Sequence, residues 1–210
     1  MSRYSKTLGL LGILSLGLLG ACSDQATERQ YVIKFSHVVA ANTPKGLAAE
    51  LFKELVEQRL NGRVVTEIYP SGQLMSDDDS LEALAFNEIQ MTAVSLSKYN
   101  RFTKKLQIFD LPFLFNDMEA VGRFVNTPEG QNLLTVLEDK GLMGLGFWPN
   151  GLKQLSANSP LLVPPDAKGV KFRIQESDVL EAQFLALDSN PQKLAFGEVY
   201  QALQVGTIDG

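Results

Sequence analysis

Arg173 is the first residue in this chain whose type and position suggest binding chemistry. It lies in KGVKFRIQ, residues 168–175, where apolar and polar residues alternate as they do in a half-buried strand. The apolar residues would face a core, so Arg173 points away from it. A guanidinium offers a planar fork of donors that matches a carboxylate. Arg173 is therefore either a carboxylate ligand or a solvated charge that pairs with Glu176.

Two lysines stand where ligands bind in α/β proteins. Lys98, in SLSKYNRF, follows a predicted strand, and open α/β sheets bind ligands outside the carboxyl ends of their strands. Lys153 follows the sequence PNG, where the first block of the chain passes to the second and a cleft would open. Each lysine taken alone can be an ordinary surface charge. Phe196, just before a predicted helix, would by itself be assigned to the core.

Residues for hydrolytic and metal chemistry are scarce. His37 is the only histidine in the 210 residues, and no G-x-S-x-G motif presents a nucleophilic serine. A hydrolase that uses His37 as its base remains an alternative. The run Asp77–Asp79 lacks the glycine and distal glutamate of an EF-hand, and it suits the first turn of a helix. The sequence favours a protein that is not an enzyme and holds neither a cofactor nor a metal.

The composition is that of a globular protein, with 45% hydrophobic and 20% charged residues. The net charge is −5 and the pI is near 5.0, and no basic patch marks a nucleic-acid surface, so nucleic-acid binding is excluded. Because the overall field repels anions, an anionic ligand would need local positive groups.

The N-terminus has the pattern of an export signal. Two basic residues precede an uncharged run over Leu8–Leu19, which is too short for a comfortable membrane span. The run ends in LGAC, which resembles a bacterial lipoprotein box and implies cleavage before Cys22 and attachment of lipid to its thiol. The predicted parts are a signal peptide, 1–21, and a polar tether, 22–30. A plain secretory signal with a chance cysteine is the alternative.

Cys22 also bears on redox chemistry and location. It is the only cysteine in the chain, which excludes an intrachain disulfide. With a lipid on Cys22, the mature protein would be periplasmic and anchored to the membrane without crossing it.

Strand and helix patterns alternate from Tyr31 onward. The predicted strands cover 31–39, 63–70, 90–96, 142–148, 153–157 and 170–175, and the predicted helices cover 43–62, 76–89, 127–141, 177–187 and 196–206. FDLPFLF, 109–115, is predicted as a buried turn, and 189–195 as extended chain. TIDG, 207–210, resembles the start of another strand.

This alternation predicts an α/β fold. The first block, 31–150, and the second, 151–210, meet at a segment rich in proline and glycine, so we expect two lobes with a cleft between them. Because the last strand has barely begun where the chain stops, we expect a fragment or a truncated product with an incomplete second lobe.

Several motifs together resemble one family. The segment GVKFRIQESDVLEAQFLALDSNPQKLAFGEVYQALQVGTIDG, 169–210, closely resembles the signature region of the extracytoplasmic solute-binding proteins of TRAP transporters. FSHVVAANTPKG, YPSGQL, SLSKY, FDLPFLF and NGLKQLSAN match the same family in the same order. The resemblance covers residues 31–210 and is greatest to the C4-dicarboxylate-binding branch.

The resemblance implies a two-lobed periplasmic-binding-protein-like fold with a hinge and a central cleft. Such a protein catalyses nothing; it binds an organic acid and delivers it to membrane carrier subunits. In this reading Arg173 is the main carboxylate clamp, Lys153 and Lys98 add positive charge, Ser95 adds a polar contact, and the ring of Phe196 lines the pocket. A periplasmic organic-acid sensor that acts on a signalling partner is the alternative.

The chain departs from the family pattern at its end. Members usually continue after DG with QENP-like residues that include a ligand-contacting asparagine, and this sequence stops at Gly210. The resemblance therefore implies a missing ligand contact and exposed strand edges.

Overall fold

The structure is a computed structural model that describes residues 30–210. The predicted signal peptide, Cys22 and all of the tether except Gln30 lie outside the described residues. Within 30–210, none of the helices is both long and apolar enough to cross a bilayer.

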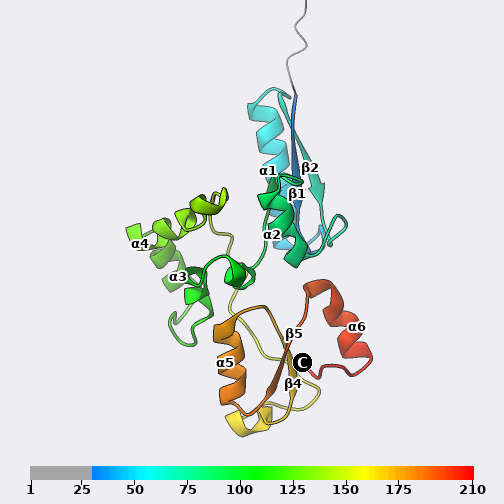
Figure 1. Cartoon of the computed structure of the whole chain (residues 1–210), viewed down its shortest axis with the longest axis vertical. Helices are drawn as coiled ribbons and strands as arrows, with labels where there is room; N and C mark the ends of the chain where they lie inside the picture. Colours follow the sequence, from blue (N-terminus) through cyan, green and yellow to red (C-terminus); the bar gives the residue numbers. More distant parts are fainter. Residues whose placement is uncertain (1–29) are drawn as a thin grey trace, which may run out of the picture.

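A three-stranded parallel sheet forms the first part of the fold. Its order is β2-β1-β3, from β1 (Tyr31–Ser36), β2 (Val64–Tyr69) and β3 (Met91–Thr92). Helices α1 (Pro44–Arg59) and α2 (Asp77–Ala85) make the crossovers that parallel strands require. Figure 1 shows this sheet and its helices at one end of the long axis.

Both crossover helices begin at the capping residues that the sequence predicts. The backbone N–H of Gly46 donates to Thr43 Oγ1 at 3.2 Å, and that of Asp79 donates to Ser76 Oγ at 3.1 Å, which satisfies donors with no partner inside a helix. Gly46 is required, because a Cβ there would lie 2.4 Å from the carbonyl oxygen of Ala41. The loop after β1 therefore packs closely against the start of α1.

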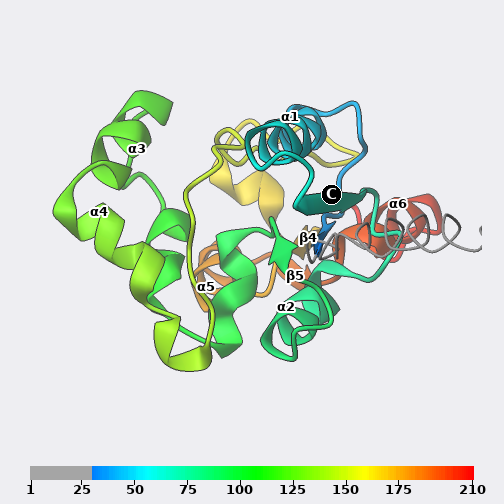
Figure 2. The same ribbon diagram turned by 90° about the horizontal axis from the view of Figure 1, so that it is seen from above.

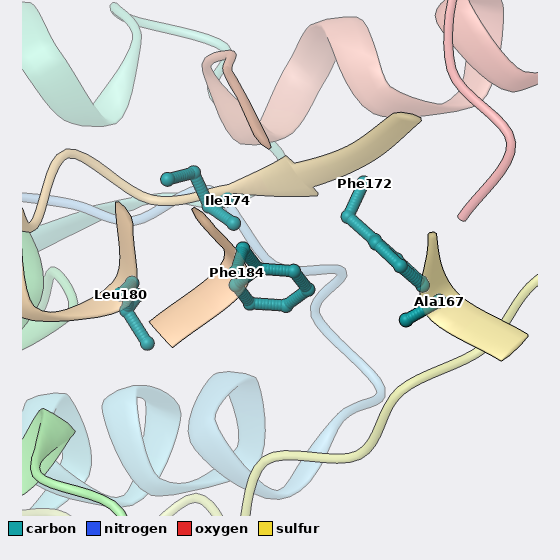
Figure 3. Close-up of a cluster of buried hydrophobic side chains, with 5 residues drawn as sticks. All are labelled: Ala167, Phe172, Ile174, Leu180 and Phe184. Carbon is teal, nitrogen blue, oxygen red and sulfur yellow. The ribbon is translucent and has the colours of Figure 1, made fainter. Parts of the chain in front are cut away.

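A two-stranded parallel sheet forms the second part. It pairs β4 (Lys171–Ile174) with β5 (Asn190–Lys193), and α5 (Asp178–Ala186) joins them. A 3-10 turn, η6 (Phe196–Glu198), leads into α6 (Val199–Gln204). Figure 3 shows the core of this part, formed by Ala167, Phe172, Ile174, Leu180 and Phe184.

The last residues lie along β4. The backbone N–H of Asp209 donates to the carbonyl of Lys171 at 2.8 Å, and that of Arg173 donates to the carbonyl of Gly210 at 2.7 Å. The backbone N–H of Gly210 also donates to the carbonyl of Lys171 at 3.3 Å, so residues 207–210 follow the edge of β4.

Short helices lie to one side of the second sheet, as Figure 2 shows from above. The 3-10 helices η1 (Leu96–Arg101) and η2 (Lys105–Asp110) pack on each other, and η2 also contacts α5. They are followed by α3 (Met118–Val125) and α4 (Pro128–Asn132), and then by η3 (Leu133–Thr135) and η4 (Glu138–Lys140). The last short element, η5 (Pro164–Ala167), precedes β4.

The single helix predicted over 127–141 is wrong. The α-helix ends at Asn132, and tighter 3-10 turns follow. These turns place Leu137 and Leu142 against Leu106 in a second buried cluster. Burial of these leucines therefore outweighs the local helical pattern.

The strands predicted over 142–148 and 153–157 are also wrong, and the third strand is only Met91–Thr92. A strand needs a neighbour for its backbone hydrogen bonds. In the described part of the chain, none of the strands forms a hydrogen-bonded ladder with 142–157. These residues are therefore extended chain without a ladder.

The buried turn predicted over 109–115 is only partly correct. Phe109 and Phe115 stack with their centroids 6.0 Å apart. At the tip, however, Phe113 is 96% exposed with a φ of 59°, and its neighbours Leu111 and Leu114 are exposed too. The apolar composition of the segment predicted burial for residues that lie outside the aromatic cluster.

Candidate ligand-binding site

A hollow of about 550 Å³ lies between the two sheets. The first part contributes the loop at Gly72, the start of α2 and Lys98, and the second contributes Glu176 and residues 193–195, 197 and 198. Ligand sites of open α/β sheets occupy such a position, outside the carboxyl ends of the strands.

Arg173 lies on β4 between the core residues Phe172 and Ile174 and is half-buried on the other face. Its Nε and Nη2 donate to the carbonyl of Leu194 at 3.0 and 2.9 Å. Burial lowers the pKa of Arg173, and the nearby charges of Asp77 and Asp78 oppose that shift.

The predicted alternative partner of Arg173 is engaged elsewhere. Glu176 Oε1 lies 3.4 Å from Arg101 Nη2. Among residues 30–210, no carboxylate lies within 4.0 Å of the guanidinium of Arg173. Arg173 is therefore neither a fully solvated charge nor a partner of Glu176.

Lys98 lies in η1 and its side chain is fully buried. Its Nζ contacts both carboxylate oxygens of Asp78, at 2.7 and 3.0 Å, and lies 3.8 Å from Asp77 Oδ2. Lys98 is therefore not an ordinary surface charge, which was one of the alternatives from the sequence. Its buried ammonium needs a counter-charge, which Asp78 supplies. Ser95 stands just before η1, and its hydroxyl lies 3.5 Å from that of Ser97.

Lys153 pairs with a buried carboxylate. Its Nζ lies 2.6 Å from Asp110 Oδ1, which also accepts a hydrogen bond from Ser97 Oγ at 2.8 Å. Phe196 begins η6 and is half-exposed; its neighbours Ala195 and Gly197 line the hollow, whereas Phe196 itself does not. The five predicted site residues therefore come from both parts of the fold, and among them only Lys98 lines the hollow.

Sequence reasoning missed the residues that balance the charge of these cations. Lys45 Nζ donates to the carbonyl of Ala93 at 3.3 Å; burial lowers the pKa of Lys45, and Asp77 opposes that shift. Asp77 and Asp78 lie in the first turn of α2, as predicted, but they also face Lys98. The sequence signal for these counter-charges was the run of three aspartates, Asp77–Asp79, at the start of a predicted helix.

The structure places His37, the candidate base of the hydrolase alternative, in the interior of the protein. His37 is buried and neither ring nitrogen has a hydrogen-bond partner among residues 30–210. Burial lowers the pKa of His37, and the backbone at Val39 opposes that shift. No group of three or more metal-ligating side chains occurs in the described part of the chain.

Comparison with known sequences identifies the family. Residues 35–210 match the model of the bacterial extracellular solute-binding protein family 7. The chain is 56% identical to the C4-dicarboxylate-binding periplasmic protein DctP of Shewanella loihica, covering 85% of this chain and 53% of that protein. It is 50% identical to the DctP protein of Vibrio cholerae, covering 95% of this chain and 62% of that protein. The chain thus spans slightly more than half the length of these relatives.

Solved structures agree. A TRAP periplasmic solute-binding protein from Shewanella oneidensis with bound succinate superposes with a TM-score of 0.84 at 55% identity, covering 86% of this chain and 59% of that chain. One from Pseudomonas aeruginosa with bound L-malate gives a TM-score of 0.83 at 51% identity, covering 85% of this chain and 62% of that chain.

These matches confirm the expected two-lobed solute-binding fold, of which the chain covers a part. They also confirm the resemblance to the TRAP dicarboxylate branch. The relatives are solute-binding receptors, a class distinct from enzymes. The chain belongs to the bacterial extracellular solute-binding protein family 7.

Proposed function

We propose that this protein is an extracytoplasmic receptor that captures a C4-dicarboxylate, or a closely related organic acid, for a TRAP-type secondary transporter. The observation that carries the proposal is that relatives at 55% and 51% identity hold succinate and L-malate. The positive charges of Arg173, Lys153 and Lys98 support it, because a dicarboxylate needs positive groups at both ends in a chain whose net charge is −5.

In the proposed mechanism, the lobes 31–150 and 151–210 close on the ligand. Arg173 takes one carboxylate with its guanidinium fork, and closure removes water and strengthens this contact. Lys153 and Lys98 supply positive potential for the second carboxylate, and Ser95 supplies a hydroxyl. Phe196 covers the methylene carbons of the ligand. Lys98 remains paired with Asp78, so it contributes less charge than a free lysine.

We further propose that the mature protein is periplasmic and held on the membrane by lipid on Cys22. The support is the LGAC sequence at the end of the apolar run and the periplasmic location in the relatives' names. Radiolabelled palmitate in growing cells tests this: label should enter the wild-type chain and not Cys22→Ser. Equal labelling of both proteins would refute the anchor.

Delivery to a carrier distinguishes the proposal from a sensor of the same fold. The test is uptake of labelled succinate by proteoliposomes that contain the membrane subunits of a TRAP carrier, with and without the purified chain. We expect uptake only when the chain is present. Succinate binding without any support of uptake would favour the sensor.

A further inference from the structure

Asp110 ends η2 at a point where three separate segments meet. Its carboxylate accepts from Ser97 in η1 and from Lys153 at the start of the second block. Its backbone carbonyl accepts from the side-chain amide of Gln183 in α5. The side chain of Asp110 is only 2% exposed, whereas that of Lys153 is 48% exposed. The pair thus has a fixed, buried anion and a cation that reaches the surface.

This asymmetry suggests which partner positions the other. A lysine is a point charge on a flexible four-carbon stem, and its ammonium has three donors. One of the donors of Lys153 is used by Asp110 Oδ1 at 2.6 Å, which restricts where Nζ can lie. The other two donors stay available to a ligand. Asp110 therefore turns a mobile charge into one with a defined position.

The second oxygen of the Asp110 carboxylate takes no part in these hydrogen bonds. Asp110 Oδ2 is buried and has no hydrogen-bond partner among residues 30–210. A buried carboxylate is normally bonded at both oxygens. Ser97 Oγ and Lys153 Nζ both donate to Oδ1. The position of the Asp110 carboxylate is therefore fixed through Oδ1.

We propose that Asp110 is a positioning residue of the ligand site: it holds Lys153 for the second carboxylate of the ligand and so favours dicarboxylates over monocarboxylates. This inference rests on the proposed function. The link from Gln183 to the backbone carbonyl does not involve the carboxylate, so a side-chain replacement at position 110 spares that contact with α5.

The test is a double-mutant cycle between Asp110→Asn and Lys153→Met in the whole chain. The ligands are succinate and succinamate, in which an amide replaces one carboxylate, and binding is measured by titration calorimetry. We expect Asp110→Asn to weaken succinate about tenfold and succinamate less than about twofold. In the Lys153→Met background, Asp110→Asn should have no further effect.

The matched control is Asp178→Asn, which removes an exposed carboxylate that pairs with Lys104 close to the contact between η2 and α5. It should leave both affinities unchanged. Equal losses for both ligands in Asp110→Asn, or additive losses in the cycle, would overturn the inference. If Asp110→Asn does not fold, Ser97→Ala replaces it, since it removes one restraint on Asp110; it should show a smaller loss confined to succinate, and an equal loss for both ligands would again overturn it.

The same titrations separate this inference from the proposed function. A wild-type chain that binds succinate, with no coupling between positions 110 and 153, overturns the positioning role alone. A folded wild-type chain that binds no dicarboxylate overturns the proposed function and, with it, the role of Asp110.

Discussion

Each cation of the candidate site already interacts with an anion or a carbonyl of the chain itself. Lys98 contacts Asp78, Lys153 contacts Asp110, and Arg173 donates to the carbonyl of Leu194. A ligand must therefore offer better geometry than these internal partners. A planar carboxylate does so most clearly at Arg173, because the neutral carbonyl of Leu194 leaves the positive charge uncompensated.

Replacing Arg173 by lysine keeps the charge and removes the fork. We expect succinate binding to weaken by about 1.5–3 kcal/mol, the range for a hydrogen bond to a charged group, because lysine keeps the charge but loses the bidentate fork. That range corresponds to a loss of affinity of at least about tenfold. Titration calorimetry measures the loss, and Lys171→Ala, on the same strand and face, is the control. Equal affinities in wild type and Arg173→Lys would rule out the clamp.

The sequence located Arg173 correctly on the polar face of a strand, because alternation along a strand is a local pattern. It could not reveal the partners of Lys98 and Lys153. Asp78 lies 20 residues from Lys98, and Asp110 lies 43 residues from Lys153. Only tertiary packing brings such residues together. Burial of Lys98 was missed for the same reason.

At the scale of elements, the N-terminus of α5 carries many of the links between the second sheet and the short helices. Ser177 caps α5, and its hydroxyl also lies 3.4 Å from Gln107 Oε1 in η2. Gln107 Oε1 accepts from the backbone of Val179 at 3.2 Å as well. The sequence predicted this cap and the helix start, because capping depends on residues three apart. It mispredicted 142–148 and 153–157 as strands, because a strand depends on distant neighbours.

Ser177→Ala should destabilise the protein. The fully buried hydroxyl accepts from the backbone N–H of Leu180, and loss of such a cap costs about 0.5–2 kcal/mol. Urea unfolding measures the change in the free energy of unfolding. Ser159→Ala, at an exposed loop position, is the control and should change little. A stability unchanged in Ser177→Ala would mean that the cap makes no net contribution.

Asp178, also at the start of α5, links stability to pH. Hydrogen bonds from Lys104 and then Asn100 lower its pKa below the ordinary 3.8. Because the folded pKa is depressed, its contribution is fully present above 3.8 and is lost as the pH falls through the lower folded value. We expect Asp178→Asn to flatten the stability profile below about pH 4, measured as melting temperature against pH. A profile identical to that of wild type would contradict this link.

At the scale of the whole molecule, two small parallel sheets face each other across a hollow lined by charged side chains from both. The α/β class and the two blocks were predictable, because helix and strand periods differ along the chain. The exposure of Phe113, Leu162 and Tyr200 was not, since composition alone predicts burial of such residues. The proposed function depends, at this scale, on closure of the two parts around one ligand.

The most direct test of the account is titration calorimetry of the whole chain with succinate, and with butyrate as the monocarboxylate of equal length. We expect one saturable site for succinate and at least about tenfold weaker binding of butyrate, because butyrate has no second carboxylate to interact with the second cation. At a succinate concentration a hundredfold above the dissociation constant, the free energy of unfolding should rise by about 2.7 kcal/mol. A cooperatively melting chain that gives neither heat nor stabilisation with succinate would contradict the proposal that this protein is a dicarboxylate receptor.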